Sequence, residues 1–392
     1  MINTPYYCKS RSLDLYVGAA AGKMISVVAA MHAVELNAYL VTLPVLRAED
    51  SVRYQNSGFS RKDGVPVLFL ASHANKWLRF FFGLWGFAKF ALTRVNSTDR
   101  VIVYNHKIEY ISALIVLNFR KIPVFQDIED VPIREEKGLK GFLNHIGYKL
   151  VSRLTSERKI TVSHQIAENE KISDYLPVYG VFSSVDNHPS EKLKSSSSFL
   201  DQPLRIHYGG TLQHTTGIDL FVDAVLLLER QINLEKFYFC FIVTGVGRLE
   251  TIRALQFKLR SERIRIEIHK SLSRKDYLAL LRSCHASLSL RLPSASISAT
   301  TFPSKVIEIV SNHVALISTK VSDVPLIFDE SNSFLLDEAT SNELATLFQQ
   351  IARSPEILRQ KADAGYLLAQ ERFSPSAVGQ SLASFLGARS SD

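Results

Sequence analysis

The sequence predicts an α/β protein built from two Rossmann-like domains, and three observations lead to this prediction. The chain has 392 residues, which is too long for one hydrophobic core. Short apolar runs alternate with helical segments in both halves, an order that gives parallel sheets with right-handed crossovers. A serine-rich polar stretch at 183–203 separates the halves, and such stretches without apolar periodicity are linkers.

The first half opens with an expected βαβ unit: a strand at 13–17, a small-residue turn at 18–23, a helix at 24–35 and a strand at 38–43. A polar loop follows at 47–63. Further strands are expected at 65–71, 100–104, 122–126, 159–163 and 176–181, and helices at 75–94, 110–119 and 141–154.

The second half repeats the alternation. Strands are expected at 204–208, 237–244, 264–268, 286–290 and 314–317, and helices at 218–229, 273–283, 343–353, 355–371 and 374–386, with Ser273 as an N-cap. A sharp turn is expected after the first of these strands, at 209–212. We therefore expect domains at 1–185 and 204–373, a linker at 186–203 and a terminal segment at 374–392.

Net charge and cysteine content limit the classes of partner and the cellular compartment that we expect. A net charge of +8 favours an anionic partner, but no zinc-finger, RNP or KH pattern is present, so nucleic acid is not expected. The three cysteines are scattered and odd in number, which favours a reducing compartment. We read no signal peptide and no apolar run long enough to span a membrane, and we expect a cytoplasmic protein.

The stretch 299–319 is the most informative for function. Pro303 is tolerated in a first helical turn, because its missing N–H would have no partner there. A helix N-terminus attracts phosphate, and Ser304 and Lys305 lie beside this one. Glu308 lies one turn further on the same face, where a carboxylate suits a pair of sugar hydroxyls. These residues predict a site for a phosphorylated sugar or a nucleotide; an ordinary loop–helix–strand unit is the alternative.

The run FPSKVIE at 302–308, followed by a helix and the strand-like ALIST at 315–319, resembles the donor-binding segment of family 4 glycosyltransferases. The segments YGGTL…GIDLFVDA, FIVTGVG and LSRKDYLALLRSCHASLSL follow landmarks of that family in order. The resemblance implies the GT-B fold, in which two Rossmann-like α/β/α domains face each other across a cleft and the last helix returns to the first domain. It also implies that Glu308 holds the ribose of a nucleotide-sugar and that Lys305 lies near the diphosphate.

The resemblance assigns a larger donor-binding set. Its members are Gly209, Gly210, Thr211, Gly245, Phe302, Pro303, Ser304, Lys305 and Glu308. The backbone at Gly209 and Gly210 can cradle a phosphate, although a sharp turn alone would demand glycine equally well. The expected donor is a nucleoside diphosphate sugar, and no cofactor is expected.

Two segments of the first half are candidates for the acceptor side. The small-residue turn with Gly18, Gly22 and Lys23 matches neither a dinucleotide fingerprint nor a P-loop. In the resembling family this turn faces the cleft; a plain tight turn is the alternative.

Three carboxylates follow the strand expected at 122–126. Asp127, Glu129 and Asp130 repel one another unless a cation or a hydroxyl-rich ligand is close. The resemblance places acceptor-side polar residues at this strand end, so Asp127 and Glu129 are predicted to position the acceptor, with Asp130 less favoured. A solvated acidic loop is the alternative reading.

The sequence departs from the family at several donor positions. The usual glutamate, arginine, lysine, glycine and proline are replaced by Thr300, Thr211, Thr216, His313 and Ala315. Because phosphate still needs positive charge, we predict that Lys305 and Arg291 supply it. No histidine pair has a metal-ligand spacing such as HExxH, and no metal is expected.

The segment 75–94 is the most aromatic of the chain. Its aromatic residues are Trp77, Phe80, Phe81, Phe82, Trp85, Phe87 and Phe90, and Lys76, Arg79, Lys89 and Arg94 are interleaved with them. A basic, aromatic helix of this kind can lie in the interface of an anionic membrane. The alternative is a helix that buries its aromatic residues inside the domain.

These features together predict a metal-independent retaining glycosyltransferase of the hexosyltransferase type. It is expected to transfer a sugar to a glycan or lipid-linked glycan in cell-surface polysaccharide assembly, in the cytoplasm or on the inner face of the membrane. Two alternatives remain open: an inactive GT-B protein that binds a glycan or a partner enzyme at the membrane, and a sugar-nucleotide 2-epimerase.

Overall fold

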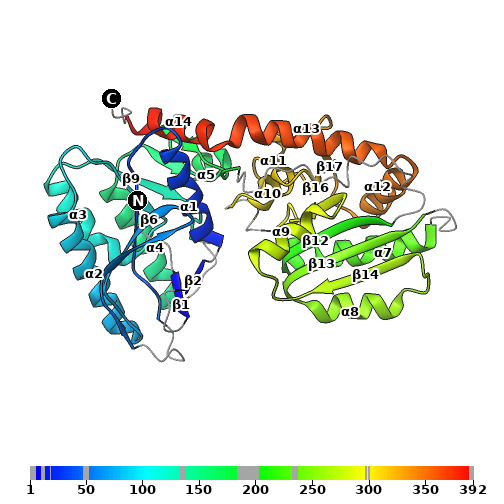
Figure 1. Cartoon of the computed structure of the whole chain (residues 1–392), viewed down its shortest axis with the longest axis horizontal. Helices are drawn as coiled ribbons and strands as arrows, with labels where there is room; N and C mark the ends of the chain where they lie inside the picture. Colours follow the sequence, from blue (N-terminus) through cyan, green and yellow to red (C-terminus); the bar gives the residue numbers. More distant parts are fainter. Residues whose placement is uncertain are drawn as a thin grey trace. The chain divides into compact units, whose positions relative to one another are not determined.

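The computed structural model describes residues 6–9, 14–17, 19–46, 53–132, 138–182, 203–231, 237–295, 298 and 301–387 (Figure 1). The chain divides into two compact units. The first unit comprises residues 1–181 and 374–392, and the second comprises residues 182–373. Of the predicted linker at 186–203, only Pro203 lies among the described residues.

The second unit is built on one six-stranded sheet whose hydrogen-bonded pairs are all parallel. Its strands are β12 (Leu204–Leu212), β13 (Phe239–Gly247), β14 (Ile264–His269), β15 (Ala286–Ser289), β16 (Ala315–Thr319) and β17 (Phe334–Leu336), in the spatial order β14-β13-β12-β15-β16-β17. Numbered from its own first strand, this is the order 3-2-1-4-5-6 of a Rossmann fold. The strand order reverses between β12 and β15, and ligands of such sheets bind beyond the carboxyl ends of the strands at that point.

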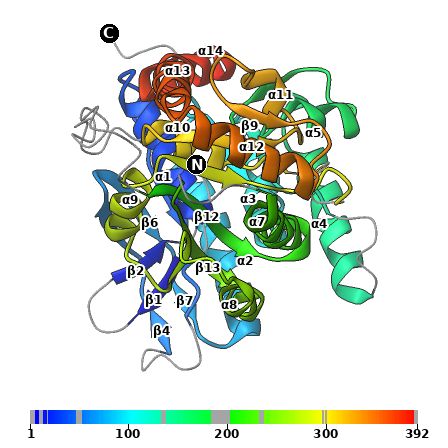
Figure 2. The same ribbon diagram turned by 90° about the vertical axis from the view of Figure 1, so that its right-hand side faces the viewer.

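Helices cover both faces of this sheet. They are α7 (Ile218–Gln231), α8 (Leu249–Lys258), α9 (Arg274–Arg282), α10 (Lys305–Ser311), α11 (Val324–Ile327), α12 (Ser341–Arg353) and α13 (Glu356–Phe373), with a 3-10 turn η2 (His214–Thr216). Ser273 caps α9 as predicted, because its side chain accepts a hydrogen bond from the N–H of Asp276. Helices α7 and α12 pack against each other (Figure 2).

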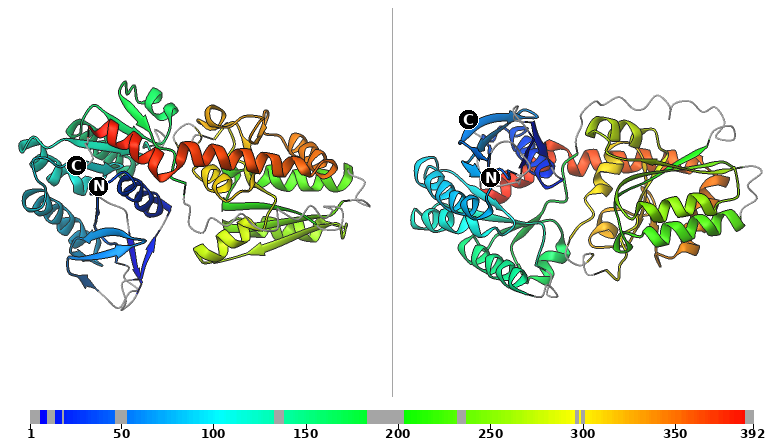
Figure 3. Two further views of the ribbon diagram at one scale, coloured as in Figure 1. Left: turned by 45° about the horizontal axis from the view of Figure 1, so that its top comes forward. Right: turned by 90° about the horizontal axis from the view of Figure 1, so that it is seen from below.

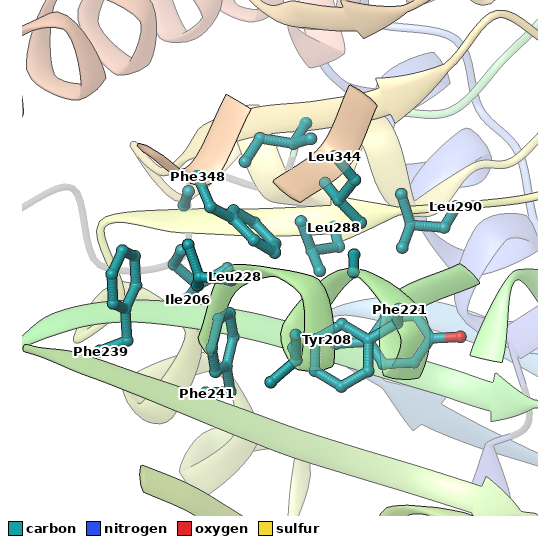
Figure 4. Packing of buried hydrophobic residues seen from close by; sticks show 14 of the residues in the cluster. Ile206, Tyr208, Phe221, Leu228, Phe239, Phe241, Leu288, Leu290, Leu344 and Phe348 are labelled. Carbon is teal, nitrogen blue, oxygen red and sulfur yellow. The ribbon is translucent and has the colours of Figure 1, made fainter. Parts of the chain in front are cut away.

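The main core of the second unit lies between the sheet and these two helices (Figure 4). Ile206 and Tyr208 of β12 point into it, whereas His207 between them points to the opposite face, as the period of a strand requires. Tyr208 stacks on Phe221 of α7 with ring centroids 4.8 Å apart. The apolar run of β13 is buried on both faces, which is why it reads as continuous rather than alternating.

The sharp turn expected at 209–212 is wrong. Strand β12 continues through these residues, paired in register with β13 from Gly209↔Thr244 to Leu212↔Gly247. The glycines fit this extension for a different reason: Gly245 has φ of +120°, and a Cβ on it would lie 1.9 Å from the carbonyl oxygen of Gly210. Glycine here permits close strand pairing, so its presence did not indicate where the strand ends.

The first unit contains several smaller sheets. A parallel four-stranded sheet has the order β11-β10-β9-β8, and a three-stranded sheet has the order β3-β6-β5. The strands are β3 (Leu40–Thr42), β5 (Gly58–Lys62), β6 (Val65–Phe69), β8 (Val101–Tyr104), β9 (Val124–Ile128), β10 (Lys159–Thr161) and β11 (Tyr175–Pro177). Two antiparallel pairs complete the unit, β1 (Tyr6–Lys9) with β2 (Asp14–Val17) and β4 (Tyr54–Gln55) with β7 (Ser72–His73).

The helices of the first unit come from both ends of the chain. They are α1 (Ala19–His32), α2 (Lys76–Thr93), α3 (Ile111–Phe119), α4 (Leu139–Leu154), α5 (His164–Asn169) and α14 (Pro375–Leu386), with a 3-10 turn η1 (Ile108–Tyr110). The predicted return of the last helix is confirmed, because α14 packs on α1 (Figure 3). The two backbones approach closely: a Cβ on Gly379 would lie 2.2 Å from the carbonyl oxygen of Ala30.

Three expectations for the first unit are wrong. The strand expected at 13–17 pairs antiparallel with β1 and does not open a parallel βαβ unit. The turn expected at 18–23 is helical from Ala19, since a run of alanines favours a helix and tolerates Gly22 within it. The loop expected at 47–63 contains β4 and β5. No helix among the described residues is long and apolar enough to cross a bilayer.

Candidate functional site

A lysine lies at the end of the central strand of the second unit. Lys305, the first residue of α10, donates a hydrogen bond from Nζ to the carbonyl oxygen of Gly209 in β12, at 2.9 Å. Its ammonium group is also 5.7 Å from the centroid of the Tyr208 ring. Burial lowers the pKa of Lys305 to about 8. The charge of Arg291 adds to this effect, and the charge of Glu308 opposes it. This cation therefore sits beside the strand-order reversal of the sheet.

Arg291 follows β15, the neighbour of β12. Its Nη1 donates hydrogen bonds to the carbonyl oxygen of Thr301, at 3.1 Å, and to the Thr301 hydroxyl. The carbonyl of Arg291 accepts a hydrogen bond of 2.5 Å from the hydroxyl of Thr319, at the end of β16. Arg291 and Lys305 thus both lie in the connection between β15 and β16, near enough for the Arg291 charge to influence the Lys305 amine.

Glu308 is held by two residues of α9. The hydroxyl of Tyr277 donates to Oε2 of Glu308 at 2.9 Å, and the guanidinium of Arg274 forms an ion pair with Oε1. The Glu308 side chain is 21% exposed. Burial and the charge of Glu308 raise the pKa of Tyr277, so Tyr277 remains a neutral donor. Tyr277 and Arg274 were not predicted from the sequence, although a tyrosine one turn after the predicted N-cap of α9 was a usable signal.

Gly209 is packed against a buried polar pair. A Cβ at this position would lie 2.4 Å from Oγ1 of Thr244 and 2.6 Å from Nε2 of His207. His207 is 3% exposed, and its ring nitrogens contact the hydroxyl of Ser287 at 2.7 Å and that of Thr244 at 2.9 Å. Burial and the nearby Lys305 charge lower the pKa of His207 to about 3, so the ring is neutral. This support was not predicted from the sequence.

The remaining donor-side residues fall into two groups. Phe302 and Pro303 are buried and anchor the loop before α10, which begins at Lys305 rather than at the proline. Ser304, Gly210 and Thr211 are exposed, and Gly245 is half-buried. Gly210 has φ of +109° with no atom within 4 Å of an added Cβ, so its glycine meets a backbone requirement in open space.

The first unit carries a buried acid–lysine cluster. Nζ of Lys23 lies 2.5 Å from Oε2 of Glu129 and 4.0 Å from Oδ1 of Asp127. Burial alone would lower the pKa of Lys23, but the charges of Asp127 and Glu129 outweigh it and raise the pKa. Asp127 is 2% exposed, and this burial raises its pKa to about 6. The charge of Lys23 opposes the rise, and the charge of Glu129 adds to it.

Asn105 ties together the loops that follow β8 and β9. Its backbone N–H donates to the carbonyl oxygen of Asp127 at 2.7 Å, and its Oδ1 accepts from the N–H groups of Glu129 and Asp130 at 2.8 and 3.0 Å. Asn105 has φ of +57°, a conformation that asparagine tolerates better than most residues. The hydroxyl of Tyr104, just before it, hydrogen bonds to Glu129.

The structure therefore brings Lys23, predicted from a small-residue turn, next to Asp127 and Glu129, predicted from a strand end. Gly22 has open space around its Cα, with nothing within 4 Å of an added Cβ. Gly18 and Thr300 lie outside the described residues. Among the residues that the structure describes, no group of histidine, cysteine and acidic side chains is suited to hold a metal ion.

Comparisons with known proteins match part of the chain to a family model and nearly all of it to solved structures. A family model described as glycosyl transferase-like matches residues 233–384. No curated protein sequence matches the chain. Solved structures do match: a sucrose-phosphate synthase from Thermosynechococcus elongatus is 12% identical with a TM-score of 0.65, over 97% of this chain and 94% of that one.

Two further similar structures were determined with bound ligands. HepE from Anabaena, in complex with UDP, is 14% identical with a TM-score of 0.62, over 97% of this chain and 98% of that one. An α,α-trehalose-phosphate synthase (UDP-forming) from Burkholderia xenovorans, in complex with glucose 6-phosphate, is 12% identical with a TM-score of 0.60, over 99% of both chains. The chain therefore has the GT-B fold, and its residues 233–384 are similar to a glycosyl transferase-like family.

Proposed function

We propose that this protein is a retaining, metal-independent hexosyltransferase that moves a sugar from a nucleoside diphosphate sugar to a hydroxyl group of its acceptor. The observation that carries the proposal is the grouping of Lys305, Arg291 and Glu308 in the connection that follows β15, with Lys305 bonded to the neighbouring strand β12. Two cations at the strand-order reversal match the charge of a diphosphate, and one carboxylate beside them can accept hydrogen bonds from the hydroxyls of a neutral ribose.

The cations account for the chemical step. When the sugar leaves the donor, negative charge grows on the departing diphosphate. A cation fixed in place before the reaction stabilises that charge without reorganisation, and stabilisation of this kind usually lowers the barrier more than any other effect in an active site. Lys305 is fixed by its hydrogen bond to Gly209 and Arg291 by its bonds to Thr301, so both are oriented in advance.

Glu308 is proposed to bind the ribose hydroxyls. Its carboxylate is partly exposed and is oriented by Tyr277, so it can accept hydrogen bonds from a diol while its second partner, Arg274, is displaced or moves aside. Arg274 is 67% exposed, and an exposed ion pair of this kind contributes little to stability.

The acid–lysine cluster of the first unit is proposed to serve the acceptor. Glu129 keeps 19% exposure and can contact an acceptor hydroxyl, whereas Asp127 is buried and would act by holding Lys23. We propose a glycan or lipid-linked glycan as the acceptor, used in cell-surface polysaccharide assembly, and a cytoplasmic location. HepE with UDP and with UDP and glucose supports a uridine nucleotide as the first donor to test.

An inactive GT-B binding protein is a second candidate, favoured by the ion pair that already engages Glu308.

Calorimetric titration with UDP, GDP and ADP tests the proposed transferase. We expect one of these nucleotides to bind, and Glu308→Gln to weaken its binding by about 10- to 100-fold, the loss of a charged hydrogen bond. The matched control is Glu267→Gln, a partly exposed glutamate on β14 that also pairs with an arginine and is expected to leave binding unchanged.

Absence of nucleotide binding would contradict the proposal and favour the inactive protein. Product analysis then separates transfer from epimerisation: a 2-epimerase converts its nucleotide-sugar without an acceptor, whereas a transferase forms a glycoside only when an acceptor is supplied.

A further inference from the structure

Three neighbouring helices of the first unit expose an unusual number of large apolar side chains. On α2, Trp77 is 73% exposed, Phe81 61% and Trp85 71%. Leu78 and Leu92 on the same helix are exposed as well. Exposed single apolar residues are common in proteins, but a contiguous set marks an interaction surface.

The exposed residues of α2 form one stripe. At about 100° per residue, Trp77, Leu78, Phe81, Trp85 and Leu92 fall within an arc of about 100°. The opposite side of the helix is the one that packs: Phe87, Phe90 and Ala91 are buried. Gly83 belongs to this inner side, where an added Cβ would lie 2.8 Å from a methyl group of Leu43.

The helix is therefore fully packed on its inner side, and its outer aromatic residues are not needed for the core. The sequence offered two alternatives for this segment: a helix in a membrane interface, or a helix that buries its aromatic residues. The structure shows features of both, because some rings are buried and others are exposed.

The apolar surface continues on the two adjacent helices. Helix α2 packs on α3, and α3 packs on α4. Ile115 and Phe119 are exposed on α3, one turn apart, and Phe142, Leu143 and Leu150 are exposed on α4. In the described part of the second unit, by contrast, exposed large apolar residues are distributed singly: Val246, Phe257, Leu326 and Leu367.

The charge of the three helices has one sign. The sequences of α2, α3 and α4 contain no Asp or Glu, whereas α7, α8, α9, α12 and α13 of the second unit each carry an acidic residue in the first turn. The exposed cations of the three helices and their ends are Lys76, Lys89, Arg94, Arg120, Lys149 and Arg153. This charge disfavours a second copy of the chain on the same face, because the cations of the two copies would repel one another.

We propose that α2, α3 and α4 form a docking face for an anionic lipid bilayer. The rings of Trp77, Phe81 and Trp85 enter the boundary between headgroups and acyl chains, and the surrounding lysines and arginines contact anionic headgroups. Tryptophan suits this position because its ring is apolar and its N–H can reach water. Docking does not require sugar transfer, so it holds for an inactive protein as well.

The chain supplies its own reporter for the test. It contains two tryptophans, and both lie on this face. Intrinsic fluorescence and co-sedimentation are measured with vesicles of phosphatidylglycerol and phosphatidylcholine in equal parts, and with vesicles of phosphatidylcholine alone. We expect a blue shift of the emission and co-sedimentation with the anionic vesicles, both diminished by added salt because salt screens exposed charges.

Substitutions on α2 test whether this face is the one that binds the vesicles. Phe81→Ser keeps both tryptophans and is expected to abolish most of the shift, and Lys76→Gln with Lys89→Gln is expected to lower the partition coefficient by about fivefold per charge. The matched controls are Phe257→Ser, which removes a ring that is 89% exposed on α8 of the second unit, and Lys258→Gln beside it. Both controls are expected to bind vesicles like the wild type.

Three results would overturn the proposal: no shift with anionic vesicles, equal binding to neutral vesicles, or self-association of the free protein that Phe81→Ser abolishes. If Phe81→Ser lowers the thermal midpoint, quenching of the wild-type emission by brominated phosphatidylglycerol decides the question, since unquenched tryptophans would exclude insertion.

Discussion

Lys305 and Gly209 lie 96 positions apart in the sequence, yet the lysine amine donates a hydrogen bond of 2.9 Å to the glycine carbonyl. This contact joins the start of α10 to the central strand of the Rossmann-like sheet. It also leaves the amine in a buried setting next to Arg291, and both conditions disfavour its protonated form.

Nucleotide binding is expected to depend on the charge of Lys305. Because the pKa of this lysine is lowered to about 8, the amine is protonated below that pH and neutral above it. We therefore expect the affinity for a nucleoside diphosphate to fall as the pH rises through about 8. Calorimetry over this range measures the effect. Lys305→Arg, which keeps the charge at all these pH values, is expected to remove the decline, and a decline that persists in this variant would assign it to another group.

Acid is expected to destabilise the second unit through His207. Its pKa is lowered from 6.5 to about 3 in the folded protein, so the unfolded chain binds more protons between these values. The contribution of His207 to the unfolding free energy is thus fully present above pH 6.5. It is lost as the pH falls from 6.5 towards 3, at about 1.4 kcal/mol per pH unit for one group. His285, whose pKa is lowered to about 4 by burial and Arg205, acts in the same direction.

Urea unfolding at several pH values measures this loss. His207→Gln removes the titrating group while keeping hydrogen-bonding capacity, and it is expected to flatten the pH dependence of the unfolding free energy. An unchanged slope in this variant would mean that other groups dominate.

Two glycines are expected to respond oppositely to alanine. At Gly209 an added methyl would lie 2.4 Å from Thr244 and 2.6 Å from His207, so Gly209→Ala is expected to lower the unfolding free energy by about 2–4 kcal/mol. Gly22 is helical and has no atom within 4 Å of an added Cβ, so Gly22→Ala is expected to raise it by up to about 1 kcal/mol. Denaturant titration of both variants makes the comparison.

Removal of the Lys23 amine is expected to destabilise the first unit. Lys23→Met leaves Asp127 and Glu129 without their cation, and an unpaired buried charge costs about 3–5 kcal/mol. Adding Glu129→Gln removes one of the two repelling carboxylates and is expected to recover part of the loss. A double-mutant cycle on unfolding free energies tests this coupling, and strict additivity would show that Lys23 and Glu129 do not interact energetically.

Much of the second unit follows from sequence pattern, because its strands are short apolar runs between amphipathic helices. The cap of α9 at Ser273 is a local rule and was predicted. The end of β12 was missed because it depends on pairing with β13, and the same glycines fit either a turn or a tightly paired strand. Pattern alone could not separate these two uses of glycine.

The candidate site was predicted in part. Lys305 and Glu308 were predicted from one loop–helix–strand unit and from resemblance, and Arg291 from the need for positive charge near a phosphate. Lys23 was predicted from a small-residue turn, and Asp127 and Glu129 from the end of a strand. The supporting residues were not found: His207 under Gly209, Tyr277 beside Glu308 and Asn105 between two loops all depend on which strands and helices become neighbours. Such partners are far apart in sequence, so no local pattern indicates them.

The placement of α14 on α1 has a consequence for biosynthesis. One packed core of the first unit contains Val378, Leu382, Phe385 and Leu386 from α14, so that core cannot close until the ribosome has made those residues. The second unit, whose residues form one continuous segment, can close first. The part of the first-unit core that α14 completes therefore forms only after synthesis has reached the end of that helix, whereas the separate core around Phe87 and Tyr110 contains, among the described residues, none from α14.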